Sequence, residues 1–307
     1  MSDADRSKPL DFLDDEARRL VEEAGLSPDA IPSSSFFSAA VDTEVDAARR
    51  AAARREHEAA SEAAAGHAAA ESAARDADAA SGFTPTSGNE LQAKIAARRA
   101  AGNDEPLRLG VLLSGSGTNL QAIIDRIAAG TLNATIELVV SSRPSAFGLQ
   151  RAEKAGLQTL TLSKEIYANP MAADEVIASE LYSHKVDYVI MAGYMRMVHA
   201  PILVTFPNRV VNLHPALLPS FPGAHAIDDA YARGVKVTGV TVHFANAAYD
   251  AGPIIAQRPV IVEEGWSVDE LEAHIHEVEH ELYPDTIQLL AEGRVQVRPD
   301  GVVEVAE

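Results

Sequence analysis

Hydrophobic and polar positions along the chain change their spacing near Pro106. From Leu107 onward, short apolar runs alternate with longer segments in which apolar residues recur every three or four positions. The short runs predict buried β-strands, whereas the spaced segments predict helices with one apolar face. The predicted strands cover residues 107–113, 135–142, 157–162, 186–193, 209–215, 235–244 and 252–262, and the predicted helices cover residues 120–130, 145–156, 171–185, 224–234 and 267–293.

This alternation predicts an α/β fold, with a mainly parallel sheet and helices on both of its faces. The last two strands, separated by a loop, are expected to form an antiparallel edge, and the helix over residues 267–293 is expected to finish the domain. In such sheets, ligands bind beyond the carboxyl ends of the strands, near the point where the strand order reverses. Three strand ends are therefore candidate sites, and they read SGSGTN, MAGYMRM and NLHPALLPSFPG.

The first hundred residues have a different pattern. Residues 44–80 consist mostly of Ala, Glu, Asp and Arg, which favour a helix, but they lack a sustained stripe of large apolar residues. Further helices are predicted over residues 13–26 and 89–104, and a loop over residues 81–88. We therefore expect an Ala-rich extension over residues 1–105, helical or disordered, ahead of an α/β domain over residues 106–307. A solvated spacer and a docking arm for a protein partner both remain open for the extension.

Composition narrows the classes of function and partner. The apolar fraction of 47% is ample for a core, while the formal net charge of −19 opposes binding to nucleic acid and anionic membrane surfaces. Cysteine is absent, which excludes disulfides, thiolate catalysis and cysteine-ligated metals. The first residues contain no apolar signal core, and no stretch is apolar for long enough to span a bilayer. These features lead us to expect a soluble, cytoplasmic protein.

The segment SGSGTN, residues 114–119, is a candidate phosphate cradle. Its two glycines let backbone amides approach an anion, and the helix that follows adds the partial positive charge of its N-terminus. Ser116, Thr118 and Asn119 supply helix caps and side-chain donors. The segment lacks both the G-x-G-x-x-G spacing and the Walker lysine, so it is neither a dinucleotide fingerprint nor a triphosphate loop. A plain tight turn is the alternative.

Three polar residues form the second candidate site. Asn212 and His214 lie two positions apart on a predicted strand, so their side chains point to the same face. A carboxamide beside an imidazole can hold a developing oxyanion and move a proton. Asp250, in the segment YDAGPII, adds to this chemistry if it meets His214, because a carboxylate favours the charged imidazole and fixes its orientation. The alternatives are a turn aspartate and loop side chains satisfied by local hydrogen bonds.

Taken in order, six segments closely resemble the phosphoribosylglycinamide formyltransferases, the folate-dependent enzymes of purine (IMP) biosynthesis. The resemblance runs from about Leu107 to about Val295, and its segments are SGSGTNLQAIID, SSRPSAFGLQRAEKAGL, MAGYMRM, VVNLHPALLPSFPGAHAIDDA, GVTVHFANAAYDAGPIIAQ and EHELYP. It implies a Rossmann-like formyltransferase catalytic domain over residues 106–307. It also implies transfer of the formyl group of 10-formyltetrahydrofolate to the amine of 5-phosphoribosylglycinamide, the glycinamide ribonucleotide, without a metal.

The resemblance also implies residue roles. Asn212, His214 and Asp250 match the catalytic trio, in which the amide and the charged imidazole stabilise the oxyanion and the carboxylate helps to transfer a proton. The other matches are Gly115, Ser116, Gly117, Thr118 and Asn119 for the ribonucleotide's phosphate, Glu279 for its ribose hydroxyls, and Met195, Arg196, Met197 and Val198 for the folate pocket. One position departs from the family: the stretch near residue 170 has no Arg for the folate's glutamate tail, so we expect recognition of the tail either to be weaker or to use Lys164.

The string HEVEH over residues 276–280 also fits the H-E-x-x-H zinc motif. His276 and His280 lie one helical turn apart, but His274 lies on a different face, so a third ligand is missing. Because the resemblance gives Glu279 a role in substrate binding, we interpret the motif match as accidental. His243, which alternates with apolar neighbours, is expected to be a satisfied histidine of the core or pocket wall.

Several functional alternatives stay open at this point. A formyltetrahydrofolate deformylase would share the trio but hydrolyse the folate, a zinc hydrolase would use HEVEH, and an interaction module would depend on the first hundred residues. We expect small-molecule substrates as partners, with neither nucleic acid nor membrane. The sequence leaves a monomer and a homodimer equally open.

Overall fold

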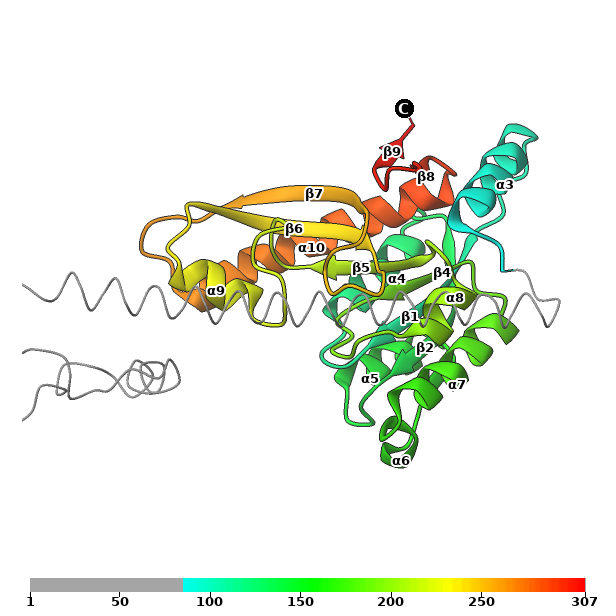
Figure 1. Cartoon of the computed structure of the whole chain (residues 1–307), viewed down its shortest axis with the longest axis horizontal. Coiled ribbons are helices and arrows are strands. Elements are labelled where there is room, and N and C mark those ends of the chain that lie inside the picture. The colour runs from blue at the N-terminus through cyan, green and yellow to red at the C-terminus, as the bar shows by residue number, and fades with distance from the viewer. Residues whose placement is uncertain (1–84, 307) are drawn as a thin grey trace, which may run out of the picture. The chain divides into compact units, whose positions relative to one another are not determined.

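The computed structural model describes residues 85–306, in which seven strands form one sheet with helices on both faces (Figure 1). The strand order is β3-β2-β1-β4-β5-β6-β7. The strands are β1 (Leu107–Leu113), β2 (Ala134–Ser141), β3 (Thr159–Thr161), β4 (Tyr188–Met191), β5 (Val210–His214), β6 (Val237–Phe244) and β7 (Ile254–Ile261). The helices are α3 (Gly88–Ala100), α4 (Thr118–Ala128), α5 (Phe147–Lys154), α6 (Lys164–Tyr167), α7 (Pro170–Ser183), α8 (Ala200–Thr205), α9 (Ala226–Ala232) and α10 (Val268–Ala291).

The predicted α/β fold with a mainly parallel sheet is confirmed. Strands β1 to β5 pair parallel with one another, whereas β6 pairs antiparallel with both β5 and β7, as expected for the edge. Strand β1 is buried along almost its whole length because helices cover both faces of the sheet, which explains its unbroken apolar run. After β3 the chain returns to the other side of β1 with β4, so the strand order reverses between β1 and β4. Their carboxyl ends therefore flank the switch point, where ligands bind in such sheets.

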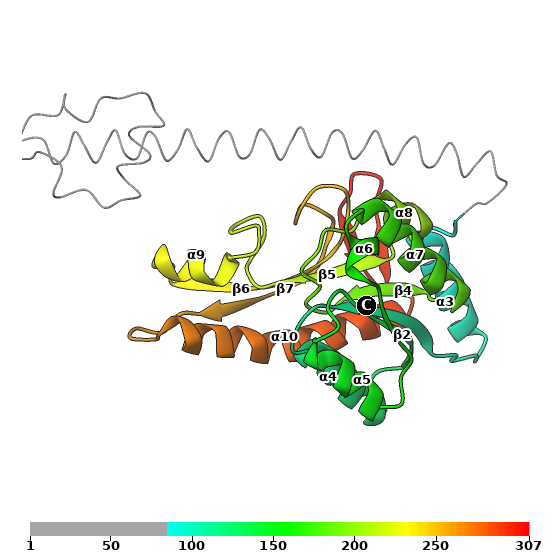
Figure 2. The same ribbon diagram turned by 90° about the horizontal axis from the view of Figure 1, so that it is seen from below.

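Two hydrophobic layers hold the helices on the sheet. Helices α4, α5 and α10 lie on one face, and α6, α7 and α8 lie on the other (Figure 2). Leu120 of α4 and Ile275 of α10 are buried in the first layer, while Ile177 of α7 and Ile202 of α8 are buried in the second. Each helix thus turns its apolar stripe toward the strands, as the spacing of three and four positions predicts.

Some short elements are absent from the sequence-based expectation. Helices α6 and α8 have four and six residues, too few for a period to be recognised. A hairpin of three-residue strands, β8 (Val295–Val297) and β9 (Val303–Val305), follows α10. The expectation that the long helix finishes the domain is therefore wrong.

Helix α3 lies in the segment expected to be an extension, yet it packs on the α/β domain. Ile95 is 2% exposed and belongs to the core beside α4 and α10. The Gln92 amide donates to the Tyr188 hydroxyl at 3.0 Å and to the Leu290 carbonyl at 2.9 Å. Its oxygen accepts the Val295 N–H at 3.0 Å, so one buried side chain connects α3 to β4, α10 and β8.

The boundary after residue 105 stays a prediction. The helices predicted over residues 13–26 and 44–80 fall outside the described residues. Between residues 85 and 306, no helix is both long and apolar enough to cross a membrane.

Tyr283 connects α10 to the two strands that lead into the candidate site. Its ring is fully buried, and its hydroxyl lies 3.1 Å from the Met191 carbonyl of β4 and 2.9 Å from the Val211 carbonyl of β5. The hydroxyl proton is shared between these two carbonyl oxygens, one on each strand. The helix and both strand ends are thereby held together at the same point.

We expect Tyr283→Phe to lower the free energy of unfolding by about 1–3 kcal/mol, because it removes a buried hydroxyl that donates to the Met191 and Val211 carbonyls. Urea denaturation followed by circular dichroism measures the loss. Tyr231→Phe is the matched control, since Tyr231 is 40% exposed and donates to the Trp266 carbonyl at 2.9 Å. The control should cost less than about 0.5 kcal/mol. Equal losses for the two variants would contradict the role given to the buried hydroxyl.

Candidate active site

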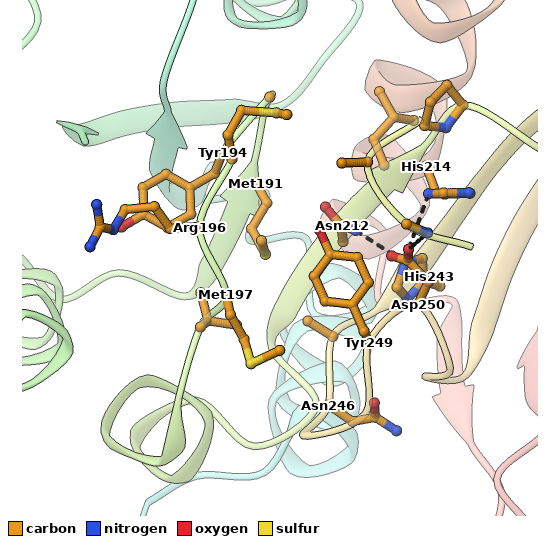
Figure 3. Close-up of a pocket in the computed structure, with 18 of the residues that line it drawn as sticks. Met191, Tyr194, Arg196, Met197, Asn212, His214, His243, Asn246, Tyr249 and Asp250 are labelled. Atoms are coloured by element: carbon orange, nitrogen blue, oxygen red, sulfur yellow. Dashed lines mark hydrogen bonds and ion pairs between the residues drawn. The ribbon is translucent and has the colours of Figure 1, made fainter. Parts of the chain in front are cut away.

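A cavity of about 210 Å³ opens at the carboxyl ends of β4 and β5. Figure 3 shows Asn212, His214, His243 and Asp250 close together on one side of it, while Arg196 points away from them. The predicted residues that line this cavity are Met195, Arg196, Met197, Val198, Asn212, His214, Asp250, Asn119 and Glu279. Segments separated by up to 160 positions are thus brought to one site. Gly115, Ser116, Gly117 and Thr118 are not among the lining residues.

His214 is held in one orientation by a backbone carbonyl. Asn212 and His214 both lie on β5, two positions apart, as predicted. The Nε2–H group of His214 donates to the Phe221 carbonyl at 2.7 Å, because a carbonyl oxygen can only accept. Phe221 has a φ of 54°, an uncommon conformation for an aromatic residue. With Nε2 occupied, Nδ1 is the atom through which His214 can gain or lose a proton.

Asp250 faces that second nitrogen. Its Oδ2 atom lies 3.4 Å from His214 Nδ1, and the two side chains are 5% and 4% exposed. The same oxygen accepts the Gly223 N–H at 2.9 Å. Asp250 has a φ of 50°, in the left-handed region that Asp tolerates better than most residues. The predicted meeting of the imidazole and the carboxylate is therefore present in the structure.

His243 connects the amide to this pair. Its Nδ1–H group donates to the Phe244 carbonyl at 2.9 Å, which leaves Nε2 to accept a hydrogen from the Asn212 amide at 3.2 Å. Burial lowers the pKa of His243 below its usual range, which favours this neutral form. Nε2 also lies 3.8 Å from Asp250 Oδ1. The expected pocket-wall histidine thus positions Asn212, and the second amide hydrogen of Asn212 stays available to a ligand.

The segment of residues 195–198 is fixed at both ends. The Met195 N–H donates to the Ser114 hydroxyl at 2.9 Å, just after β1. At the other end, Asp174 accepts the His199 N–H at 2.6 Å and lies 2.9 Å from its Nδ1 atom. These contacts hold the intervening backbone along the cavity wall.

The guanidinium group of Arg196 contacts Tyr167 rather than the residues of the trio. Its guanidinium lies 4.3 Å from the centre of the Tyr167 ring and donates to the Tyr167 carbonyl at 3.1 Å. The segment thus offers a ligand mainly its backbone and its two Met side chains. Lys164, the expected contact for a folate tail, is exposed at the start of the same short helix α6. Its contact with a ligand stays a prediction.

The glycine-rich loop borders the cavity through Asn119. Gly117 has a φ of 70°, and a Cβ atom there would lie 2.6 Å from the Cα atom of Gly148, so the turn requires glycine. Asn119 donates to Glu279 at 2.9 Å, and its own oxygen is buried without a partner. An orphaned buried acceptor indicates a site for a ligand that donates hydrogen bonds. Glu279 is 5% exposed, and burial raises the pKa of its carboxyl group.

The zinc interpretation of HEVEH receives no geometric support. The rings of His276 and His280 are stacked with their centres 6.3 Å apart, and Glu279 between them bonds to Asn119. Zinc requires ligand atoms about 2.0–2.2 Å from the metal. No group of three His, Cys, Asp or Glu side chains that could hold a metal ion occurs within residues 85–306.

Four functional contacts were not predicted from the sequence. They are the Phe221 carbonyl, the Gly223 N–H, the Ser114 hydroxyl and the pairing of His243 with Asn212. The proline-rich loop after His214 was the one available signal, since rigid loops build pockets. The other contacts join segments far apart in the sequence.

Together these side chains provide an imidazole, a carboxylate beside it and a free amide hydrogen facing one cavity. This arrangement can stabilise an oxyanion and move a proton between two atoms of bound ligands. An acid–amide pair, Glu279 and Asn119, adds a place for hydroxyl groups at the edge.

Comparisons with known proteins agree with this chemistry. Residues 107–287 match the family model described as formyl transferase. The human trifunctional purine biosynthetic protein adenosine-3 is 39% identical over 196 residues, which make up 64% of this chain and 19% of the human protein. The phosphoribosylglycinamide formyltransferase of Bacillus subtilis is 36% identical over 183 residues, 60% of this chain and 94% of that protein.

Comparison with solved structures agrees with these sequence matches. The crystal structure of glycinamide ribonucleotide transformylase 1 from Symbiobacterium toebii is 45% identical and has a TM-score of 0.64, with 66% of this chain and 95% of that chain covered. The chain thus spans about a fifth of the trifunctional human relative but nearly all of the single bacterial proteins.

Proposed function

Because this chain belongs to the formyl transferase family, we propose that it transfers the formyl group of 10-formyltetrahydrofolate to the amine of 5-phosphoribosylglycinamide. The products are formylglycinamide ribonucleotide and tetrahydrofolate, in purine biosynthesis. The observation that carries this proposal is the meeting of Asn212, His214 and Asp250 at one cavity whose edge holds Asn119 and Glu279. Similarity to proteins named for this reaction supports it.

The chemistry begins with attack of the amine nitrogen on the formyl carbon. A new C–N bond forms, the carbonyl electron pair moves to oxygen, and the developing oxyanion is stabilised by the free Asn212 hydrogen and by the proton on His214 Nδ1. Asp250 orients this imidazole and offers it an opposite charge, since its carboxylate faces Nδ1. The proton lost by the amine passes through Asp250 to the folate nitrogen. The bond between that nitrogen and the formyl carbon then breaks, and neutral tetrahydrofolate leaves.

Two further subsites bind the substrates in this proposal. The backbone of Met195, Arg196, Met197 and Val198 holds the folate along the cavity wall. On the other side, Glu279 and the orphaned Asn119 oxygen accept hydrogen bonds from the ribose hydroxyls. The backbone N–H groups of residues 115–119 face the phosphate at the start of α4. In this proposal, substrate binding therefore depends on three parts of the chain: residues 115–119 after β1, residues 195–198 after β4, and Glu279 on α10.

The decisive experiment is a formyl-transfer assay with glycinamide ribonucleotide as acceptor. We expect tetrahydrofolate to form together with the formylated ribonucleotide, one for one. A parallel reaction without the amine acceptor distinguishes the deformylase alternative, because a deformylase would release formate and tetrahydrofolate at full rate. Turnover that does not need the ribonucleotide would contradict the proposed function.

We expect Glu279→Gln to stabilise the folded protein at pH 7 while weakening its binding of the ribonucleotide. Burial raises the pKa of the folded-state carboxyl group above its unfolded value, so the charge it carries near pH 7 opposes folding. That penalty is absent below the unfolded pKa and grows as the pH rises through the folded pKa. The variant should therefore be more stable than the wild type at pH 7 and equal to it near pH 4.

The same variant should raise the KM for the ribonucleotide roughly tenfold, because an amide accepts hydrogen bonds from a diol less strongly than a carboxylate does. Thermal unfolding at the two pH values and steady-state kinetics measure the two effects. A variant that is less stable at pH 7, or one with an unchanged KM, would contradict this role of Glu279.

The remaining sequence-based expectations concern the chain as a whole. We propose that residues 106–307 form the catalytic domain together with α3, and that its ligands are small molecules. The cytoplasmic location, the choice between monomer and homodimer and a protein partner for the extension stay predictions.

A further inference from the structure

A second cavity, of about 470 Å³, lies at the edge of the sheet opposite the candidate active site. Among its lining residues, Arg108 is the second residue of β1, whereas Asp187 and Arg209 directly precede β4 and β5. Because these three strands are parallel, the residues lie together at the amino ends of the strands. The candidate active site lies at the carboxyl ends of β4 and β5, and the two cavities share no lining residue.

Positive charge dominates this second cavity, which we call the basic cavity. Four of the described residues that line it are basic, namely Lys94 of α3, Lys185 after α7, Arg108 and Arg209. Asp187 is the single acidic residue of the lining, and Arg108 already engages both of its oxygens. One oxygen accepts the Arg108 N–H at 3.0 Å, and the other lies 3.2 Å from Nη2. In a chain with a formal net charge of −19, this local excess of cations favours an anionic ligand.

Arg209 is a buried cation that is bonded only to neutral groups. The residue is 7% exposed, and its two Nη atoms donate to the carbonyls of Asp187 at 3.2 Å and Thr205 at 2.8 Å. The guanidinium also lies 4.8 Å from the centre of the Phe206 ring, while its Nε atom is buried without a partner. Within residues 85–306, no carboxylate forms an ion pair with it. A buried charge without an opposite charge is costly, and a bound anion would supply that charge.

Lys185 occupies a backbone position at which glycine is usual. It follows His184, the C-cap residue of α7, and has a φ of 56°. Glycine is common at this left-handed position because a Cβ atom is unfavourable there. Lys185 and Lys94 are both exposed, and neither forms an ion pair with another described residue. Two ammonium groups at the cavity are thus available to a ligand.

We propose that the basic cavity binds a small organic phosphate, at a site separate from the candidate active site. Arginine and lysine are the side chains that recognise phosphate, and a phosphate monoester offers up to two negative charges and three acceptor oxygens. Leu91, Val186 and the Tyr182 ring give the cavity an apolar wall for the organic part of the ligand. The volume lies in the range of about 300–1,000 Å³ that is typical of small-molecule sites. The inference does not depend on the proposed function.

A titration of the full chain with phenyl phosphate, followed by phosphorus NMR, tests this inference. Near pH 8 the phosphate group of this probe is a dianion. Inorganic phosphate is the matched probe without an organic part. We expect phenyl phosphate to bind roughly threefold or more tightly than inorganic phosphate, because its ring covers the apolar wall. Absence of binding, or equal affinities for the two probes, overturns the proposal.

Two double variants locate the bound anion. Lys94→Gln/Lys185→Gln should weaken the binding of phenyl phosphate at least about tenfold, because charge-assisted hydrogen bonds are lost. Arg233→Gln/Lys236→Gln removes the same charge from exposed positions after α9, and it should change the affinity by less than about twofold. Equal losses in the two variants overturn the proposal, since net charge alone would then explain the binding. Wild-type affinity in the first variant also overturns it, because the anion then binds elsewhere, for example beside the glycine-rich loop.

Lys185→Gly distinguishes a binding role of this side chain from a structural role. Glycine adopts a φ of 56° without strain, so the melting temperature should equal or exceed that of the wild type. The affinity for phenyl phosphate should nevertheless fall roughly fivefold. Unchanged affinity overturns the assignment of Lys185 to the site. These measurements use neither folate nor ribonucleotide, so their failure contradicts this inference alone, whereas failure of formyl transfer contradicts only the proposed function.

Discussion

Replacing Asp250 with Asn is expected to lower kcat for formyl transfer by roughly 10²- to 10⁴-fold, the range associated with a positioned proton-transfer group. The variant keeps the shape of the side chain, and its oxygen can still accept the Gly223 N–H. It loses the negative charge that lies 3.4 Å from His214 Nδ1. Without that charge, the imidazole loses the carboxylate that faces it, and the proton of the attacking amine has no acceptor.

Asp174→Asn provides a control with the same chemistry at another place. Asp174 is also buried and lies 2.9 Å from a histidine, but it supports the end of the segment of residues 195–198. Its main expected effect is a lower melting temperature, with kcat within about tenfold of the wild type. Steady-state kinetics at saturating concentrations of both substrates, together with thermal unfolding, measure both variants. A kcat within tenfold of wild type for Asp250→Asn would contradict the proposed mechanism.

The second large effect is expected for Gly117→Val, which should raise the KM for the ribonucleotide roughly 10- to 100-fold. A branched residue at a φ of 70° is strained, and its Cβ atom would approach the Gly148 backbone to 2.6 Å. The loop must therefore move, and its N–H groups no longer point at one phosphate position. Because the trio lies on other segments, kcat should change far less than KM.

Gly130→Val tests whether backbone strain alone explains such a loss. Gly130 also has a φ of 70°, and a Cβ atom there would meet nothing within 4 Å. This control should lower stability and leave the KM for the ribonucleotide unchanged. Equal changes in KM for the two variants would contradict the role of residues 115–119 in phosphate binding.

Local pattern predicted much of the sheet because its central strands are buried on both faces. Residues 107–113 were predicted as a strand and form β1, since polar or glycine-rich segments interrupt the apolar run on both sides. Period-two geometry likewise placed Asn212 and His214 on the same face of β5. Such inferences need only the residues within one element.

Contacts between elements were harder to predict because they depend on register. Asn212 and His243 are opposite each other in the antiparallel pair of β5 and β6, and the sequence does not specify that alignment. The Phe221 carbonyl depends on a loop conformation with positive φ at a bulky residue, which propensities disfavour. Apolar alternation therefore identified His243 as a residue of the core or pocket wall, but not as the acceptor for the Asn212 amide.

The three hydrogen bonds of Gln92 have a practical consequence for the expression of a minimal α/β domain. A protein that begins at residue 106 would lack Gln92 and Ile95. The Tyr188 hydroxyl would then lose the hydrogen bond from the Gln92 amide, and the Val295 N–H would lose its acceptor. A protein that begins just before residue 85 keeps helix α3 and all three hydrogen bonds of Gln92. Shortened versions of this protein should accordingly begin ahead of α3 rather than at the point where the amino-acid composition changes.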